Sequence, residues 1–266
     1  EITRDGVVTA NGTLEFSVPP LGKTEIEVPQ AAEASDLESY IRFVFTAKND
    51  TQFCEKGYEL CFDQVKLCEG KPAQVPAPEL PVQVEESAFL VTVTCGDTEF
   101  RFNKRLSAFD SIKRRGRELL EKPLTFNFFR APVDNDVMTN DWYGAHLNEL
   151  TPRNYGVTVT KTGVSAEIKL RQSMSWSVHQ PAACMDVTYR ISGGALDIGC
   201  SAEFSNKVEF LPRFGIRAFL PRSFSRVEYC GYGPRESYSD KHQASWIGKF
   251  TADVADLRED YIRPQE

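Results

Sequence analysis

Apolar and polar side chains alternate at every second position along most of this chain. The runs that show it are residues 14–18, 41–45, 58–62, 89–95, 185–191 and 196–204. Because successive side chains of a strand point to opposite faces, such runs predict antiparallel strands with one buried face each. Ser192-Gly193-Gly194 separates two of these runs and predicts a tight hairpin. Only residues 142–150 have a helical pattern, so the predicted fold class is all-β.

A proline-rich stretch divides the chain. Four prolines fall within residues 71–81. Proline fixes φ and has no N–H to donate to a sheet, so we place a linker there. Residues 1–70 contain several short strands and have the size of a small immunoglobulin-like β-sandwich. Residues 82–266 are predicted to form a larger antiparallel β-domain.

Composition narrows the class of protein. The 266 residues are 41% hydrophobic and 26% charged, as is ordinary for a globular protein, and the formal net charge is −7. An acidic chain is a poor ligand for nucleic acid or an anionic membrane, and no apolar run approaches the roughly 20 residues that span a bilayer. We therefore expect no nucleic-acid or membrane partner. The seven cysteines include no CxxC pair, which favours reduced thiols in a cytoplasmic protein over a zinc site.

The densest polar cluster follows an apolar segment, residues 124–129, that is predicted to be a central strand. It comprises Arg130, Pro132, Asp134, Asn135 and Asp136, with Met138 and Trp142 shortly after. A calcium loop is one interpretation, but an EF-hand-like loop that starts at Asp134 would need glycine at Thr139 and glutamate at Ala145. A carboxylate pair for acid–base chemistry is a second. We favour a third, an Asx-type turn in which Arg130 pairs with a buried aspartate.

A second cluster forms a tight loop after a predicted strand. It comprises Gly231, Gly233, Pro234, Glu236, Tyr238 and Asp240. The loop lacks the glycine spacing of a phosphate cradle. Glu236 and Asp240 are candidates for an acid and a base, but such side chains more often accept hydrogen bonds from backbone amides within a long loop. We favour that structural role.

Other candidates for chemistry are sparse. His146, His179 and His242 have no metal-ligand spacing, so we expect no metal site. Several aromatic side chains have faces that suit the C–H side of a sugar ring. They are Trp142, Tyr143, Trp176, Tyr232, Tyr238 and Trp246. Packing in the core is the expected role for at least half of them.

Both clusters resemble signatures of the β-galactosidases of glycoside hydrolase family 2. Residues 123–136 resemble the hallmark at the start of that family's last domain, and residues 213–216 and 232–240 resemble a second hallmark of the same domain. Residues 48–51, 57–59 and 63–65 are similar to the immunoglobulin-like domain that precedes it. The matches fall in the expected order on either side of the proline-rich stretch.

The resemblance implies a fold and a role. The last domain would be a large supersandwich of the galactose mutarotase type, and the chain is expected to stop inside it, which would leave exposed edges that favour self-association. The family's two catalytic glutamates lie on an upstream (β/α)₈ barrel, and retaining hydrolysis needs two carboxylates about 5 Å apart. No β–α alternation occurs here, so no catalytic residue carries over and the chain alone is expected to be inactive.

Site residues and partners also follow from the resemblance. The loop at residues 137–143 would lie beside the active-site mouth, which makes Asp134, Asn135, Asp136, Met138 and Trp142 candidates for its rim or for sugar contact. Met138 stands where the family often has glycine. Arg130, Pro132 and the second loop would be structural. The expected partners are the other domains of the parent enzyme and further copies in a homo-oligomer, and galactoside would bind only to the intact enzyme. The family often uses magnesium and sodium, but no cofactor site is identifiable here.

We consider three hypotheses for the function. The leading one is a non-catalytic C-terminal portion of a β-galactosidase that braces the barrel and shapes the active-site rim. The alternative is a free-standing carbohydrate-binding module that uses Trp142 or Trp246. The third is a mutarotase-like epimerase, which would need a histidine opposite Glu236 or another carboxylate; fold analogy alone does not imply that activity.

Overall fold

The computed structural model describes residues 1–28, 35–71, 80–133, 136–177, 180–238 and 241–258. The chain forms two compact units, of which the first comprises Glu1–Gln74 and Ser225–Asp260 and the second comprises Val75–Phe224 and Tyr261–Glu266. The domain boundaries predicted from the sequence stay a prediction, and residues 72–79 of the predicted linker lie outside the described residues.

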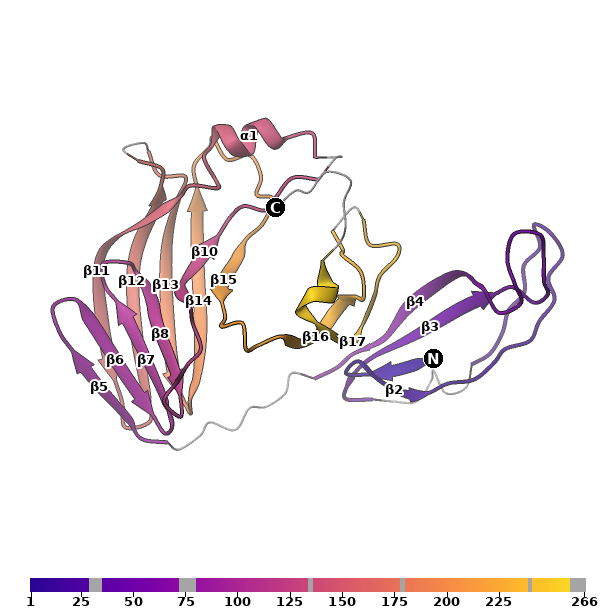
Figure 1. Cartoon of the computed structure of the whole chain (residues 1–266), viewed down its shortest axis with the longest axis horizontal. Helices are drawn as coiled ribbons and strands as arrows, with labels where there is room; N and C mark the ends of the chain where they lie inside the picture. Colours follow the sequence, from indigo (N-terminus) through magenta and orange to yellow (C-terminus); the bar gives the residue numbers. More distant parts are fainter. Residues whose placement is uncertain (29–34, 72–79, 134–135, 178–179, 239–240, 259–266) are drawn as a thin grey trace. The chain divides into compact units, whose positions relative to one another are not determined.

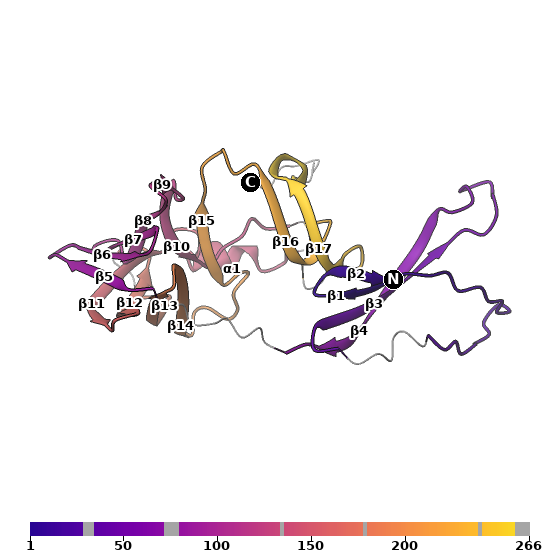
Figure 2. The ribbon, with the colours of Figure 1, turned by 90° about the horizontal axis from the view of Figure 1, so that it is seen from below.

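Two antiparallel sheets form the body of the second unit. One has the order β5-β6-β7-β8-β9, and the other has the order β11-β12-β13-β14. The strands of the first sheet are β5 Val82–Glu86, β6 Leu90–Cys95, β7 Thr98–Asn103, β8 Ala108–Arg114 and β9 Arg117–Glu118; those of the second are β11 Thr151–Lys161, β12 Ser165–Ser175, β13 Ala183–Ser192 and β14 Ala195–Phe204. Figures 1 and 2 show the two sheets layered face to face. The predicted all-β, antiparallel class is confirmed.

The facing sides of these sheets form one apolar core. The alternation in the sequence explains it, because every second residue of β6, β12 and β13 is buried. Tyr189 lies at the centre, where its ring packs 5.6 Å from that of Phe102 and 5.1 Å from that of Phe109. The predicted hairpin also forms, and Gly193 and Gly194 adopt φ values of 56° and 76° that a type I′ turn requires.

Strand β10 Lys122–Asn127 is not the central strand that its apolar sequence predicted. It pairs with β15 Gly215–Phe219 in a two-stranded sheet. Leu124 and Phe126 pack against the main core, and Phe128, which is 2% exposed, continues that packing beyond the end of the strand. Burial on this segment therefore comes from the neighbouring core and does not require a strand on each side.

The predicted helix over residues 142–150 is also displaced. The structure has a short helix α1 at Thr139–Gly144. His146 adopts a φ of +53°, which a right-handed helix cannot continue through, and the following residues form turns.

The first unit contains a four-stranded antiparallel sheet and a hairpin. The sheet has the order β2-β1-β3-β4, with β1 at Ile2–Arg4, β2 at Val7–Ala10, β3 at Glu38–Thr46 and β4 at Glu59–Glu69. The hairpin pairs β16 Arg226–Gly233 with β17 Trp246–Asp253, and the 3-10 turn η2 Val254–Leu257 follows. The strand predicted at residues 14–18 does not form. Leu14 and Phe16 are 43% and 48% exposed, so alternation alone did not supply a buried face there.

Side chains of the sheet anchor the hairpin within this unit. Arg42 and Gln64 lie opposite each other on β3 and β4 and share a face. The guanidinium of Arg42 lies 3.9 Å from the ring centroid of Trp246. The Gln64 amide donates to the Ile247 carbonyl and accepts from the Ile247 N–H, both at 2.8 Å. The Gln64 side chain thus satisfies the backbone of β17 in the way that a neighbouring strand would.

Two further observations concern membrane-spanning helices and cysteines. Within the described residues, no helix is long and apolar enough to cross a membrane. All seven cysteines are free thiols.

Replacing Gln64 with leucine should loosen the hairpin. The variant leaves both backbone groups of Ile247 without their side-chain partner, at a cost of about 0.5–1.5 kcal/mol for each hydrogen bond. We expect the Ile247 amide to exchange roughly tenfold faster in native-state hydrogen exchange. Gln52→Leu, on an exposed loop of the same unit, is the matched control and should change nothing. Unaltered protection of Ile247 in Gln64→Leu would contradict the anchoring role.

Candidate functional site

A partly buried ion pair organises the turn after β10. The guanidinium of Arg130 donates through Nη1 to Asp136 Oδ2 at 2.6 Å and through Nη2 to Asp136 Oδ1 at 2.8 Å. Each side chain is 13% exposed. This two-point geometry fixes both position and orientation, which a single contact would not do. The pairing of Arg130 with an aspartate, required by the favoured interpretation of the sequence, is present.

The same carboxylate also holds the backbone. Asp136 Oδ2 accepts a hydrogen bond from the Val133 N–H at 2.6 Å, and the Asp136 carbonyl accepts one from the Thr139 hydroxyl at 2.9 Å. The chain between the end of β10 and the start of α1 is therefore tied at three points to one residue. Pro132, just before Val133, adds a fixed φ to this turn.

Charge complementarity sets the protonation state of Asp136. Hydrogen bonds from Arg130 lower the pKa of the Asp136 carboxyl, burial opposes that effect, and the Val133 N–H lowers the pKa further. Asp136 is consequently an anion at neutral pH. A general acid needs a raised pKa, so this carboxylate suits a positioning role and does not suit proton donation.

Trp142 lies under the ion pair and is buried. The indole is 2% exposed and forms a cluster with Leu147 and Ala182, which we call the Trp142 cluster. The Arg130 guanidinium lies 5.1 Å from the indole centroid. Met138 packs against the same cluster. Sugar contact by Trp142 would require the indole to leave this packing, and the rim role predicted for Met138 and Trp142 stays a prediction.

Two of the five rim candidates cannot be placed. Asp134 and Asn135 lie outside the described residues, so the calcium-loop and carboxylate-pair interpretations that depend on them stay open. Of the five candidates for the rim, Asp136 and Trp142 contact Arg130, and Met138 packs against the Trp142 cluster.

The other aromatic candidates for sugar stacking mostly have neighbours on their faces. Tyr143 packs against Phe129, Trp176 stacks on His146 with centroids 3.6 Å apart, and Trp246 lies under Arg42. Tyr232 is the most exposed of these aromatic candidates, at 51%.

Removing the charge of Asp136 should destabilise the second unit. Asp136→Asn leaves a partly buried guanidinium without its anion, which we expect to cost about 2–3 kcal/mol in urea unfolding at pH 7. Asp141→Asn is the matched control, because Asp141 is exposed on the next turn, and it should stay within about 0.5 kcal/mol of the parent.

The same pair of variants should give a pH signature. The folded pKa of Asp136 is lowered, so its contribution is fully present above the unfolded value of about 3.9 and is lost as pH falls through the folded pKa. The stability difference between the parent and Asp136→Asn should therefore shrink below about pH 4. A difference that is independent of pH would show that the ion pair is not its source.

The second motif belongs to the first unit. It begins in β16 and continues through Gly233-Pro234, a cis peptide bond. The loop is closed by reciprocal backbone hydrogen bonds between Tyr238 and Lys241 at 3.1 and 3.0 Å. The Ser245 hydroxyl donates to the Arg235 carbonyl at 3.3 Å.

Glu236 lies inside this loop. One carboxylate oxygen accepts a hydrogen bond from the Tyr238 hydroxyl. The other oxygen is buried without a partner among the described residues. Asp240, the predicted companion of Glu236, lies outside the described residues, so the acid–base interpretation of that pair stays untested.

The two glycines of this motif differ in what surrounds them. A Cβ atom at position 233 would lie 2.5 Å from the Tyr229 hydroxyl and 2.7 Å from the Phe250 ring, whereas one at position 231 would meet nothing within 4 Å. Gly233 therefore permits a close approach of the chain to two aromatic side chains.

Alanine at these two positions should behave differently. Gly233→Ala forces the aromatic pair apart and should lower the stability of the first unit by about 1–3 kcal/mol. Gly231→Ala provides the control and should change stability by less than about 0.5 kcal/mol. Thermal unfolding followed by near-ultraviolet circular dichroism measures both. Equal midpoints for the two variants would rule out the close approach as the reason for Gly233.

Some structural residues were missed from the sequence. The anchor formed by Arg42 and Gln64 joins segments about 180 positions apart, which no local pattern reveals. A signal was available for Gln172, a polar residue in register with Ala166, Ile168, Leu170 and Met174 on one face of β12. A polar side chain at a core position of an alternating run is unusual.

Two family models match this chain. A family model described as β-galactosidase small chain matches residues 94–266, and one described as β-galactosidase, domain 4, matches residues 1–68. A β-galactosidase of Staphylococcus xylosus is 29% identical over 273 residues, which cover 98% of this chain and 27% of that protein. A β-galactosidase of Actinobacillus pleuropneumoniae is 27% identical over 271 residues, which cover 100% of this chain and 27% of that protein. The chain thus spans about a quarter of the length of these relatives.

Proposed function

The chain belongs to the β-galactosidase small-chain family, and from that premise we propose that it is the non-catalytic C-terminal portion of an enzyme that hydrolyses terminal β-galactosides. Its own contribution is to brace the catalytic barrel of the intact enzyme and to shape the rim of the active site.

The observation that carries this proposal is the ion pair between Arg130 and Asp136. It ties Arg130 and the Val133 backbone to Asp136, beside the indole of Trp142. The resemblance to family 2 implies that the loop at residues 137–143 lies beside the active-site mouth. A turn held in this way suits the positioning of a rim, because substrate orientation is sensitive to displacements of about 1 Å.

The electrostatics of the chain support a role without acid–base chemistry. A retaining glycosidase needs one carboxylic acid with a raised pKa beside a second carboxylate. Among the described residues, every carboxyl group with a clear displacement of its pKa has that pKa lowered, by hydrogen bonds or by ion pairs. They are Glu38, Asp97, Glu118, Asp136 and Glu167.

A carbohydrate-binding module that uses Trp142 or Trp246 is less well supported. The first indole is buried and the second has Arg42 on its face. Stacking on a sugar needs a free aromatic face, so neither side chain is presented for it.

The partners, the cellular compartment and the cofactors of the parent enzyme are also part of the proposal. The partners are the barrel and other domains of the parent, together with further copies in a homo-oligomer. Seven free thiols fit a reducing compartment such as the cytoplasm. Magnesium and sodium are implied for the parent by the resemblance. Within the described part of the chain, no group of three histidine, cysteine, aspartate or glutamate side chains could hold a metal ion.

A hydrolysis assay tests the proposal. The purified chain and the intact β-galactosidase that contains it are compared at equal molar concentration with a chromogenic β-galactoside. We expect the isolated chain to give the rate of the buffer blank and the intact enzyme to turn over. Hydrolysis by the isolated chain that persists after further purification would contradict the proposal, because it would require a catalytic carboxylate pair within these residues.

A further inference from the structure

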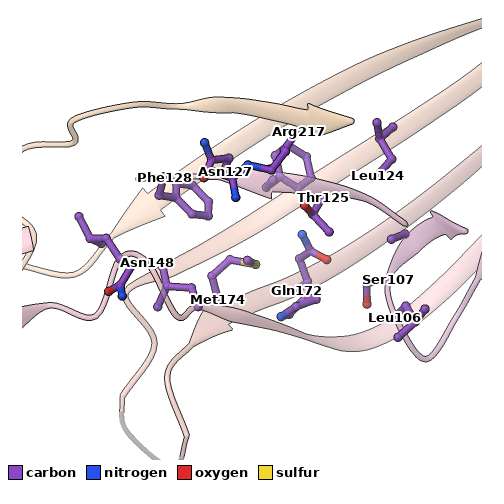
Figure 3. A pocket seen from close by; sticks show the side chains of 15 residues that line it. Leu106, Ser107, Leu124, Thr125, Asn127, Phe128, Asn148, Gln172, Met174 and Arg217 are labelled. Atoms are coloured by element: carbon purple, nitrogen blue, oxygen red, sulfur yellow. The ribbon is translucent and has the colours of Figure 1, made fainter. Parts of the chain in front are cut away.

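The second unit contains an open cavity of about 160 Å³ that no function assigned above uses. It lies among β8, β10, β12 and β15, and the segment after α1 completes it (Figure 3). Engineered apolar cavities of about 150 Å³ hold a benzene ring. The cavity therefore has room for one six-membered ring.

Gln172 provides an unsatisfied hydrogen-bond acceptor at this cavity. Its side chain is 1% exposed, and Oε1 has no hydrogen-bond partner among the described residues. The Nε2 group contacts the Met185 sulfur at 4.0 Å. Because a thioether can accept but not donate, that contact orients the amide and leaves Oε1 as the open group. A buried amide oxygen without a partner destabilises the folded chain, and a bound donor would remove that cost.

The mouth of the cavity carries further polar groups. Thr125 and Arg217 are directly opposite each other on β10 and β15, so their side chains share a face, and both are exposed. Figure 3 shows the Gln172 amide pointing from β12 toward Thr125. The Ser107 hydroxyl also lines the cavity, where it accepts from the Asn154 amide at 3.1 Å and keeps its own proton to donate. The lining of the cavity thus includes both donors and acceptors.

The chemistry of the lining selects the class of ligand. The described residues that line the cavity include no carboxylate, so a cation has no counter-charge there. A fully deprotonated anion has no proton to donate to Gln172 Oε1, and Arg217 is the single positively charged side chain of the lining. Leu124, Phe128 and Met174 add apolar surface that suits C–H groups. A neutral ring that carries hydroxyl groups satisfies all these conditions.

We propose that this cavity binds a neutral polyol the size of one pyranose ring, with a ligand hydroxyl donating to Gln172 Oε1 and the rim groups of Thr125 and Arg217 contacting the hydroxyls nearest to solvent. The proposal concerns the second unit alone and does not depend on the hydrolase assignment. The site lacks the carboxylate pair of a glycosidase, so it is a binding site and not a catalytic one.

The three methionines of the chain allow a local test. Met174 lines the cavity, Met185 contacts Gln172, and Met138 packs in the Trp142 cluster. The full chain is labelled with ¹³C at the methionine methyl groups and titrated with D-galactose, D-glucose, inorganic phosphate and benzene in separate experiments. We expect a saturable shift of the Met174 resonance with at least one of the two sugars, a smaller shift of Met185, and none of Met138.

Matched variants connect the shift to Gln172. Gln172→Leu removes the acceptor and puts an apolar side chain of similar size in its place. The affinity for the sugar should therefore fall at least tenfold. Gln83→Leu, on an exposed position of β5, should leave it unchanged. If Gln172→Leu does not fold, Thr125→Val at the rim replaces it, with exposed Thr158→Val of β11 as its control, and a severalfold weakening is expected.

Three outcomes would overturn the proposal. The first is no specific Met174 shift with either sugar up to about 10 mM, which is tenfold above a 1 mM dissociation constant. The second is a shift caused by benzene or phosphate and not by the sugars, which would make the cavity apolar or anion-binding. The third is a sugar shift that is the same in Gln172→Leu as in the parent. A failed hydrolysis assay leaves all three outcomes unaffected, so this proposal and the proposed function can fail separately.

Discussion

Burial of one face of β5–β9 against one face of β11–β14 is the interaction on which the rest of the second unit depends. Tyr189, Phe102 and Phe109 meet at its centre, and each such large side chain contributes about 1.5–3 kcal/mol when it leaves water. Strand β10, which pairs with β15 and leads into the turn with Arg130, is held in place because Leu124, Phe126 and Phe128 continue this core. The ion pair can be precise only because the packing beneath it is fixed.

Polar groups in this unit divide into satisfied and unsatisfied ones. Asp136 has the Arg130 guanidinium and the Val133 N–H as partners, and these hydrogen bonds lower the pKa of its carboxyl group. Gln172 is buried more deeply and has an oxygen without a partner among the described residues. A satisfied network specifies one conformation, whereas an unsatisfied buried group is a cost that a ligand can remove. The turn is therefore suited to positioning and the cavity to binding.

Much of the fold could be predicted from the sequence, because period-two alternation is a direct consequence of strand geometry. The strands over residues 185–191 and 196–204 and the hairpin between them are examples. Alternation failed at Leu14 and Phe16, since a pattern cannot show whether a facing surface exists. The Arg130–Asp136 pair was predictable because its members are six positions apart. The Gln64 anchor and the cavity at Gln172 depend on residues brought together by tertiary structure, so only the polar residue within an apolar run hinted at the latter.

The central claim, that this portion acts by holding a rim in place for chemistry done elsewhere, is tested most directly by steady-state kinetics of the intact enzyme with Asp136→Asn. Asp141→Asn is the control. The account predicts that kcat/KM for a β-galactoside falls about tenfold to a hundredfold in Asp136→Asn, with the loss divided between KM and kcat, and that the control matches the parent. Unchanged kcat and KM in a folded Asp136→Asn enzyme would contradict it, because the turn would then be a structural feature without influence on the active site.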